Sequence, residues 1–264
     1  MNFLTEEQTT LDLNKLRDVL VRLEDTIIFD LIERAQFARN EVIYQVDAEE
    51  FQALPAKNQS FFDYFLHEVE KMHATVRRYK SPDEYPFTSP LPEPILPPID
   101  FPKVLHPNDI NVNAEIRRLY LENIVPAICP PGNDKNYGSA ALGDVECLQA
   151  LSRRIHYGKF IAESKFRNST QQYVELIRRE DRAAIEELLT NREVEAKLLE
   201  RLRLKALNYG QSPEEEQKGE SKHLKIPVEV VVRLYEQWVI PLTKKVEVEY
   251  LMQRLKGTEW ETGQ

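Results

Sequence analysis

Two cations on one predicted helix are spaced so that both lie on the same face. Arg154 and Lys165 are eleven residues apart in a helical stretch that we predict over about 139–166. Eleven residues make three helical turns plus about 20°, which places the two side chains roughly 16 Å apart. Gly158 lies between them, and a glycine inside a helix costs about 1 kcal/mol relative to alanine. This glycine either makes room for a ligand between the cations or allows a second helix to pack closely.

Four further polar residues form two pairs at a spacing of four residues. Asn191 and Glu195 share one helix face, and Thr243 and Glu247 share another. Each pair also has a simpler interpretation, because Asn191 can cap its helix and Glu195 can be a solvated surface residue. Glu247 has apolar neighbours, so it is either an edge residue or a partly buried acid with a raised pKa.

A last candidate is Arg17, which stands against an apolar stripe. It is either a snorkelling arginine at the edge of that stripe or a cation directed at a ligand. The sequence contains no glycine-rich phosphate loop and no HExxH motif, and its five histidines are scattered. Cys129 and Cys147 are too few for a disulfide scaffold or a thiolate metal site, so we expect no bound metal.

The composition is that of an acidic globular protein. Of 264 residues, 44 are acidic and 35 basic, which gives a net charge of −9 and argues against a nucleic-acid binder. No apolar stretch approaches the roughly 18–20 residues of a membrane span. The first ten residues lack the basic start and apolar run of a secretory signal. We therefore expect a cytoplasmic protein with no membrane partner.

The elements that must position these side chains are helices. Apolar residues recur at spacings of three and four from Leu13 onward, which predicts an amphipathic helix to about Ala35. The same reasoning predicts helices at about 60–79, 113–128, 139–166, 170–179, 182–189, 191–208 and 228–255. Residues 246–250 alternate like a strand, but no partner strand of similar strength exists elsewhere. The predicted fold is therefore all-α, with no significant sheet.

Two segments interrupt this helical pattern. Nine of the sixteen prolines fall in residues 82–107, together with aromatic and aliphatic side chains, so we predict an ordered, extended strap across the helices. Residues 211–222 are polar and glycine-bearing, which predicts a mobile loop. The strap is too apolar for a flexible linker, so we do not interpret it as a domain boundary, and we expect residues 1–264 to form a single domain.

Taken together, four stretches resemble the yeast-type, all-helical chorismate mutases. They are LNKLRDVLVRLEDTIIFDLIERAQF, TVRRYKSPDEYPF, DKNYGSAALGDVECLQALSRRIHYGKFIAESKF and VIPLTKKVEVEYLMQRL, in the family's order and across nearly the whole chain. The resemblance implies rearrangement of chorismate to prephenate on the route to phenylalanine and tyrosine. It also implies a cytosolic homodimer that uses no cofactor, inhibited by tyrosine and activated by tryptophan.

The resemblance gives each polar candidate a role. Arg17 and Arg154 match the arginines that bind the two carboxylates of chorismate, and Lys165 and Glu247 match the donors to its ether oxygen. Glu195 matches the acceptor of the ring hydroxyl. The two remaining candidates, Asn191 and Thr243, match supporting polar positions.

The resemblance also implies an effector site. Its residues are Arg77, Arg78, Asn136, Gly138 and Ser139. Free N–H groups at a helix start near Ser139 suit a carboxylate, although an ordinary N-cap and a basic helix end explain the same residues. Two departures affect regulation: Leu142 and Pro227 each replace a threonine of the family pattern.

Two other functions compete with this interpretation. A non-catalytic helical interaction protein explains the composition equally well, but it gives no reason for the polar candidates to match one catalytic set. The second alternative is another shikimate-pathway enzyme that acts on a similar anion, and no phosphate or nucleotide motif in the sequence supports it.

Overall fold

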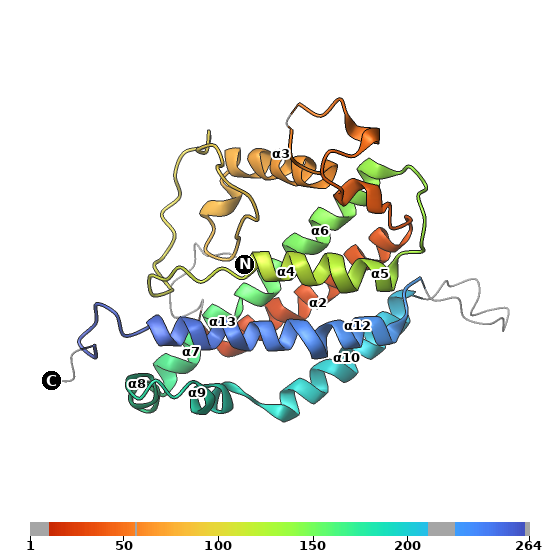
Figure 1. Cartoon of the computed structure of the whole chain (residues 1–264). Coiled ribbons are helices and arrows are strands. Elements are labelled where there is room, and N and C mark those ends of the chain that lie inside the picture. The colour runs from red at the N-terminus through yellow and green to blue at the C-terminus, as the bar shows by residue number, and fades with distance from the viewer. Residues whose placement is uncertain (1–10, 56, 211–224, 262–264) are drawn as a thin grey trace.

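The computed structural model describes residues 11–55, 57–210 and 225–261, and helices dominate these ranges (Figure 1). The α-helices are α2 (Leu13–Ala35), α3 (Phe61–Thr75), α4 (Asn113–Leu119), α5 (Val125–Ile128), α6 (Tyr137–His156), α7 (Gly158–Asn168), α8 (Thr170–Arg178), α9 (Arg182–Leu189), α10 (Arg192–Gly210), α12 (Val228–Leu234) and α13 (Ile240–Gln253). In the described ranges the only β pairing is one isolated bridge between Val46 and Ser60. The predicted all-α fold is confirmed.

The first two helices begin at side-chain caps. The Asp12 carboxylate accepts the backbone N–H groups of Asn14 and Lys15 at 2.8 and 3.3 Å, and α2 ends at Ala35 as predicted. Ser60 caps α3 in the same way, also as predicted. The α3 helix ends at Thr75, earlier than predicted, because Arg77 adopts a left-handed backbone with φ of 69°.

Two rods of the fold contain a π-helical turn, which the sequence did not predict. Residues Tyr120–Ile124 join α4 to α5, and residues Tyr235–Val239 join α12 to α13. In each rod a proline, Pro126 or Pro241, is the second residue after the turn. Proline lacks an N–H and its ring crowds the preceding turn, so a locally wider helix accommodates it. Residues 246–250 are helical within α13, as predicted.

The proline-rich strap at 82–107 contains neither helix nor strand, as predicted, and specific hydrogen bonds fasten it to the helices. The buried Glu70 carboxylate on α3 accepts the backbone N–H groups of Phe87 and Thr88, both at 2.7 Å. The Asn113 amide donates to the carbonyl of Tyr85 at 3.1 Å. The loop predicted at 211–222 lies outside the described residues.

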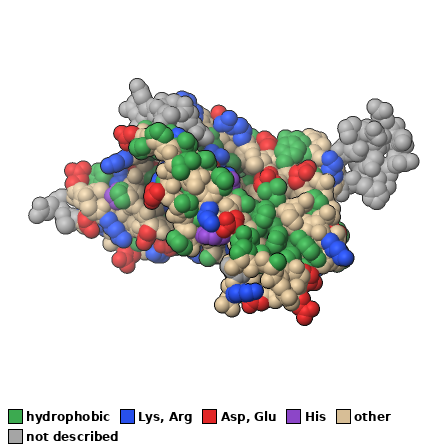
Figure 2. All heavy atoms as spheres, turned by 90° about the horizontal axis from the view of Figure 1, so that it is seen from above, with side chains coloured by type: hydrophobic (Ala, Val, Ile, Leu, Met, Phe, Trp, Pro, Cys, Tyr) green, Lys and Arg blue, Asp and Glu red, His purple; other side chains and the backbone are tan. Residues whose placement is uncertain are grey.

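The helices enclose more than one hydrophobic cluster. The largest cluster joins α2, α6, α10 and α12, whereas another joins α7, α8 and α9 to α13. In Figure 1 the rod of α12 and α13 runs beside α10, and α3 with the strap lies at the opposite side of the molecule. On the face shown in Figure 2, acidic and basic side chains are interspersed.

Two kinds of feature are absent from the described residues. No helix among them is long and apolar enough to cross a membrane. Nor do three or more His, Cys, Asp or Glu side chains gather there as they would around a metal ion.

Candidate active site

A cavity of about 300 Å³ lies between α2, α6, α7, α10 and α13. Its lining contains all seven side chains that the sequence predicts as catalytic, from both ends of the chain: Arg17, Arg154, Lys165, Asn191, Glu195, Thr243 and Glu247. Apolar side chains fill the wall between them, among them Leu13, Leu20, Ile161, Leu198 and Ile240. The cavity therefore combines several charges with an apolar wall, which is the usual constitution of a small-molecule site.

Arg154 is held in this cavity with part of its hydrogen-bonding capacity unused. It lies in the last turn of α6 with 4% of its surface exposed. Its Nη1 donates to Thr243 Oγ1 at 3.4 Å, and its guanidinium lies 5.9 Å from the ring centroid of Tyr235. Its buried Nε has no hydrogen-bond partner among the described residues. A positioned guanidinium with a spare N–H suits an anionic ligand.

The other predicted arginine differs in burial. Arg17 lines the cavity from α2, and its side chain is exposed to solvent. The two arginines thus approach one cavity from different helices, one buried and one accessible. This arrangement suits a ligand with two separated negative groups.

Glu247 is the buried acid of the cavity. Only 7% of its surface is exposed, and its carboxyl group makes no hydrogen bond or ion pair within the described ranges. Burial raises its pKa to about 7, with a smaller contribution from Glu195, whereas the nearby cations Lys165, Arg154 and Lys244 oppose the rise. Near neutral pH this carboxyl group can therefore carry a proton and donate a hydrogen bond.

Lys165 reaches the cavity from α7. Its ammonium donates to the backbone carbonyl of Leu189 at the end of α9, which leaves other N–H groups of the ammonium for a ligand. Lys165 and Glu247 thus provide the lining of this cavity with two separate donors on neighbouring helices.

Glu195 has a partner that the sequence analysis missed. Lys244 Nζ lies 2.9 Å from Glu195 Oε1, and Lys244 also lines the cavity. Its only signal in the sequence is its position next to Thr243, because a lysine within a polar run looks like a surface residue. Asn191 accepts the backbone N–H of Val194 at 3.1 Å, so it caps α10 and lines the cavity at the same time.

Gly158 allows the close packing of two helices, the second of its two predicted uses, and it also lines the cavity between Arg154 and Lys165. A Cβ on this residue would lie 3.0 Å from Thr243 Cγ2 and 3.1 Å from Glu247 Cγ. The prediction of one continuous helix over 139–166 was wrong at this point. The chain tightens at Tyr157, where the Phe160 N–H donates to the Tyr157 carbonyl at 3.1 Å, and α7 starts at Gly158.

The predicted effector residues do not come together within one chain. Arg77 and Arg78 follow the C-terminal end of α3. Asn136, Gly138 and Ser139 lie at the start of α6, where the Tyr137 ring packs 5.1 Å from that of Phe51, and Phe51 in turn stacks on Phe61 at the N-terminal end of α3. Since α3 has 15 residues, about 22 Å of helix separates the two groups.

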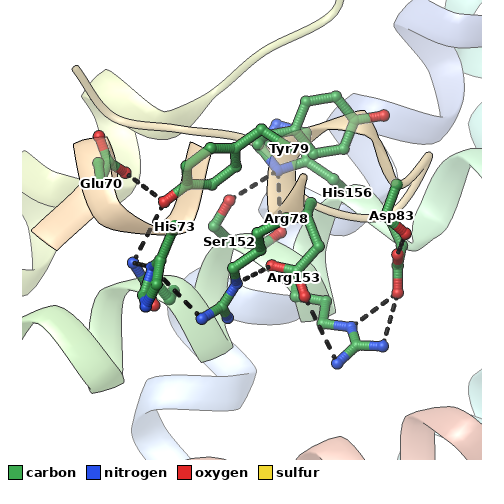
Figure 3. A network of polar contacts seen from close by, with 12 residues as sticks. Glu70, His73, Arg78, Tyr79, Asp83, Ser152, Arg153 and His156 are labelled. Atoms are coloured by element: carbon green, nitrogen blue, oxygen red, sulfur yellow. Dashed lines mark hydrogen bonds and ion pairs between the residues drawn. The ribbon is translucent and has the colours of Figure 1, made fainter. Parts of the chain in front are cut away.

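A polar network links Arg78 to the end of α6, and Figure 3 shows the side chains that form it. Glu84 lies between two cations, with Oε2 3.0 Å from Arg78 Nε and Oε1 3.7 Å from Arg153 Nη1. Arg153 also pairs with the buried Asp83, at 2.6 Å from its Nη2. Arg153, the residue before Arg154, is thus joined by ion pairs to the segment that follows Arg78.

Comparison with known proteins identifies the family. A family model for chorismate mutase type II matches residues 137–248. The chorismate mutase of Emericella nidulans is 53% identical over 268 aligned residues, which cover 98% of each of the two chains. The chain belongs to the chorismate mutase family. Membership makes the protein an isomerase, which favours the enzymatic prediction over the non-catalytic alternative.

Solved chorismate mutases share the fold. The enzyme from Candida albicans, crystallised with L-Trp, matches with a TM-score of 0.90 at 45% identity over 97% of this chain and 95% of its own. A structure of AtCM1 with tyrosine bound in its allosteric site matches with a TM-score of 0.83 at 43% identity, over 95% of this chain and 99% of its own.

The two departures from the family pattern are both placed by the structure. Leu142 lies on α6, and 45% of its surface is exposed. Pro227 directly precedes α12, with φ of −66° and ψ of 126°, and its carbonyl accepts the Val230 N–H at 3.0 Å. A proline fits this position of the chorismate mutase chain because no N–H is needed from the residue before a helix.

Proposed function

We propose that this cavity rearranges chorismate to prephenate, in the synthesis of phenylalanine and tyrosine, without a cofactor or metal ion. The observation that carries the proposal is a buried, protonatable Glu247 in one cavity with Lys165 and two arginines. Chorismate is a dianion with an ether oxygen between its two halves. It therefore needs two carboxylate-binding groups and at least one donor directed at that oxygen.

In this proposal each side chain has one task. Arg17 and Arg154 each bind a carboxylate, for which the planar guanidinium provides two parallel N–H groups. Lys165 and the protonated Glu247 donate to the ether oxygen. Glu195 accepts from the ring hydroxyl, and this contact has to replace or share its ion pair with Lys244. Two neutral side chains, Asn191 and Thr243, support the substrate and Arg154.

The chemistry requires no attacking group from the protein. One C–O bond breaks and one C–C bond forms within the same molecule, so neither a nucleophile nor a base takes part. The protein contributes by holding the substrate in its reactive conformation, with the reacting atoms near each other. It also stabilises the negative charge that develops on the ether oxygen, through donors that are in place before the reaction.

The direct test follows the diene absorbance of chorismate after addition of the purified protein. We expect rapid decay with and without EDTA, and prephenate as the product. Decay no faster than in buffer alone would overturn the proposal, and so would a product other than prephenate. A Glu247→Ala variant with a folded circular dichroism spectrum serves as the matched control for a contaminating mutase.

We further propose that the protein is a homodimer inhibited by tyrosine and activated by tryptophan. The related structures with L-Trp and with tyrosine support regulation by aromatic amino acids. Because one chain separates Arg77 and Arg78 from Asn136 and Ser139, a second copy is needed to complete a single amino-acid site from these residues. Titration of both amino acids against initial rate tests regulation, and flat responses would overturn it.

Sedimentation equilibrium tests the dimer separately, since a monomer at assay concentrations would leave the effector site incomplete.

We also propose a single domain over residues 1–264 and a cytoplasmic location. The location is supported by Cys129 and Cys147, which are both buried and not joined in a disulfide, as is usual in reducing compartments. Fractionation of cells that express a tagged chain would test it.

A further inference from the structure

A second buried glutamate lies on α7, close to the cavity but outside its lining. Glu163 is completely buried, and three side chains donate to its carboxylate. The Tyr250 hydroxyl donates at 2.6 Å, Arg254 donates from Nε at 2.7 Å and from Nη2 at 3.1 Å, and Arg167 Nε donates at 2.7 Å. Both carboxylate oxygens are therefore occupied by donors from the protein itself.

This carboxylate is ionised, in contrast to Glu247. Burial alone would raise the pKa of Glu163, but hydrogen bonds from Arg254, Tyr250 and Arg167 lower it below its usual value. A charge-assisted contact with this many donors is short and directional. The contact thus fixes the distance between the two helices that provide its partners.

Those helices are the two that carry the donors to the ether oxygen. Tyr250 follows Glu247 on α13 by three residues, and Arg254, the C-cap of α13, follows Glu247 by seven. The C-cap keeps helical backbone angles, so all three lie within about 60° of one helix face. Glu163 precedes Lys165 on α7 by two residues. The α7–α13 seam is thus fixed at two places, by the close approach at Gly158 and by the Glu163 contact further along.

We propose that Glu163 is a positioning residue, which with Tyr250 and Arg254 fixes the register of α7 against α13 and thereby places Lys165 relative to Glu247. The inference rests on the proposed function, because only a reaction that needs both donors at one atom requires this register. The residues that bind the substrate carboxylates in that proposal, Arg17 and Arg154, lie on α2 and α6. The hydrogen bond of Arg154 to α13 is made at Thr243, beside Gly158 and about two helical turns before Tyr250, so it lies at the other end of the seam from the Glu163 contact.

This separation predicts which kinetic constant changes. Loosening the seam moves donors that act in the transition state and leaves the two arginines in place, so kcat should fall while KM stays nearly constant. A misplacement of about 1 Å can cost about 10²-fold in rate. For the loss of one hydroxyl contact we expect kcat to fall about 10-fold.

The experiment compares Tyr250→Phe with Tyr44→Phe. Each substitution removes a hydroxyl that donates at 2.6 Å to a fully buried carboxylate, Glu163 in one case and Asp144 in the other. Each hydroxyl also accepts one N–H, from His106 or from Arg34. We expect similar losses of melting temperature in the two variants, and a fall in kcat at constant KM only in Tyr250→Phe.

Two outcomes would overturn the inference. One is equal kcat values in both variants at matched losses of stability, which would make the contact purely structural. The other is a rise in KM without a fall in kcat, which would mean that substrate binding and not donor placement depends on the seam. Glu163→Asp keeps the charge but shortens the side chain, and we expect this variant too to have a lower kcat at a nearly constant KM. If the wild-type protein leaves chorismate unchanged, the proposed function itself is wrong, and the inference that rests on it is wrong as well. The two failures are therefore distinguished by the activity of the wild type.

Discussion

Replacement of Glu247 by glutamine separates the role of this side chain as a donor from its titration. Glutamine has nearly the same shape and an amide that donates a hydrogen bond at every pH. The wild-type carboxyl group donates only while protonated. The substitution therefore leaves the proposed donor in place and removes its dependence on pH.

The magnitude follows from the pKa of about 7 that burial gives Glu247. At that pKa roughly 90% of the carboxyl groups are protonated at pH 6, about half at pH 7 and about 10% at pH 8. We thus expect kcat/KM of the wild type to fall about 5-fold between pH 7 and pH 8, and about 10-fold per pH unit above pH 8. The charges that determine this midpoint are Lys165, Arg154 and Lys244, which lower the pKa, and Glu195, which raises it.

The assay is the initial rate of chorismate loss between pH 5.5 and 9 at constant ionic strength, for the wild type and Glu247→Gln in parallel. We expect a falling limb with a midpoint near pH 7 in the wild type and a flat profile in the variant. A variant that loses activity over the same range would refute the reasoning, because another group would then be titrating. A flat wild-type profile would refute it too.

Three further predictions concern the same cavity. Lys165→Ala should lose about 10²–10³ in kcat/KM, as is typical for one preorganised donor, whereas near-normal turnover would remove Lys165 from the mechanism. Gly158→Ala should lower the free energy of unfolding by up to about 2 kcal/mol in urea titrations, since overpacking against Thr243 costs about 1–3 kcal/mol and the gain in helix propensity is only about 1 kcal/mol. Because Glu247 holds its proton up to about pH 7 in the folded protein but releases it near pH 4.5 in the unfolded chain, wild-type stability should fall between these two pH values relative to Glu247→Gln. The difference between 4.5 and about 7 corresponds to roughly 3 kcal/mol, and parallel stability curves for the two proteins would contradict it.

The sequence was sufficient for the elements whose signals are local. Apolar spacing located α2, and the Ser60 cap located the start of α3, because both depend on residues within one helix. The seven cavity residues were found through their misplaced polarity and the family resemblance together, and spacing alone left the role of Asn191 open.

Features that depend on long-range packing were not predictable. The Glu195–Lys244 ion pair joins α10 to α13, and a lysine in a polar run gives no sign of such a partner. The need for glycine at position 158 depends on what a side chain there would meet on α13, and no pattern within residues 139–166 contains that information. The Glu163 contact likewise joins two side chains that are nearly ninety positions apart in the chain, at 163 and 250.

The π-helical turn at Tyr235–Val239 limits how the length of this gene segment can change. A π turn holds one residue more than the α turn it replaces, so everything before it is rotated by about 100° relative to everything after it. A deletion of one residue there would restore regular helix, but it would turn Tyr235 away from Arg154 while Thr243 and Glu247 stayed in the cavity. Single-codon insertions and deletions in this segment should therefore be removed by selection.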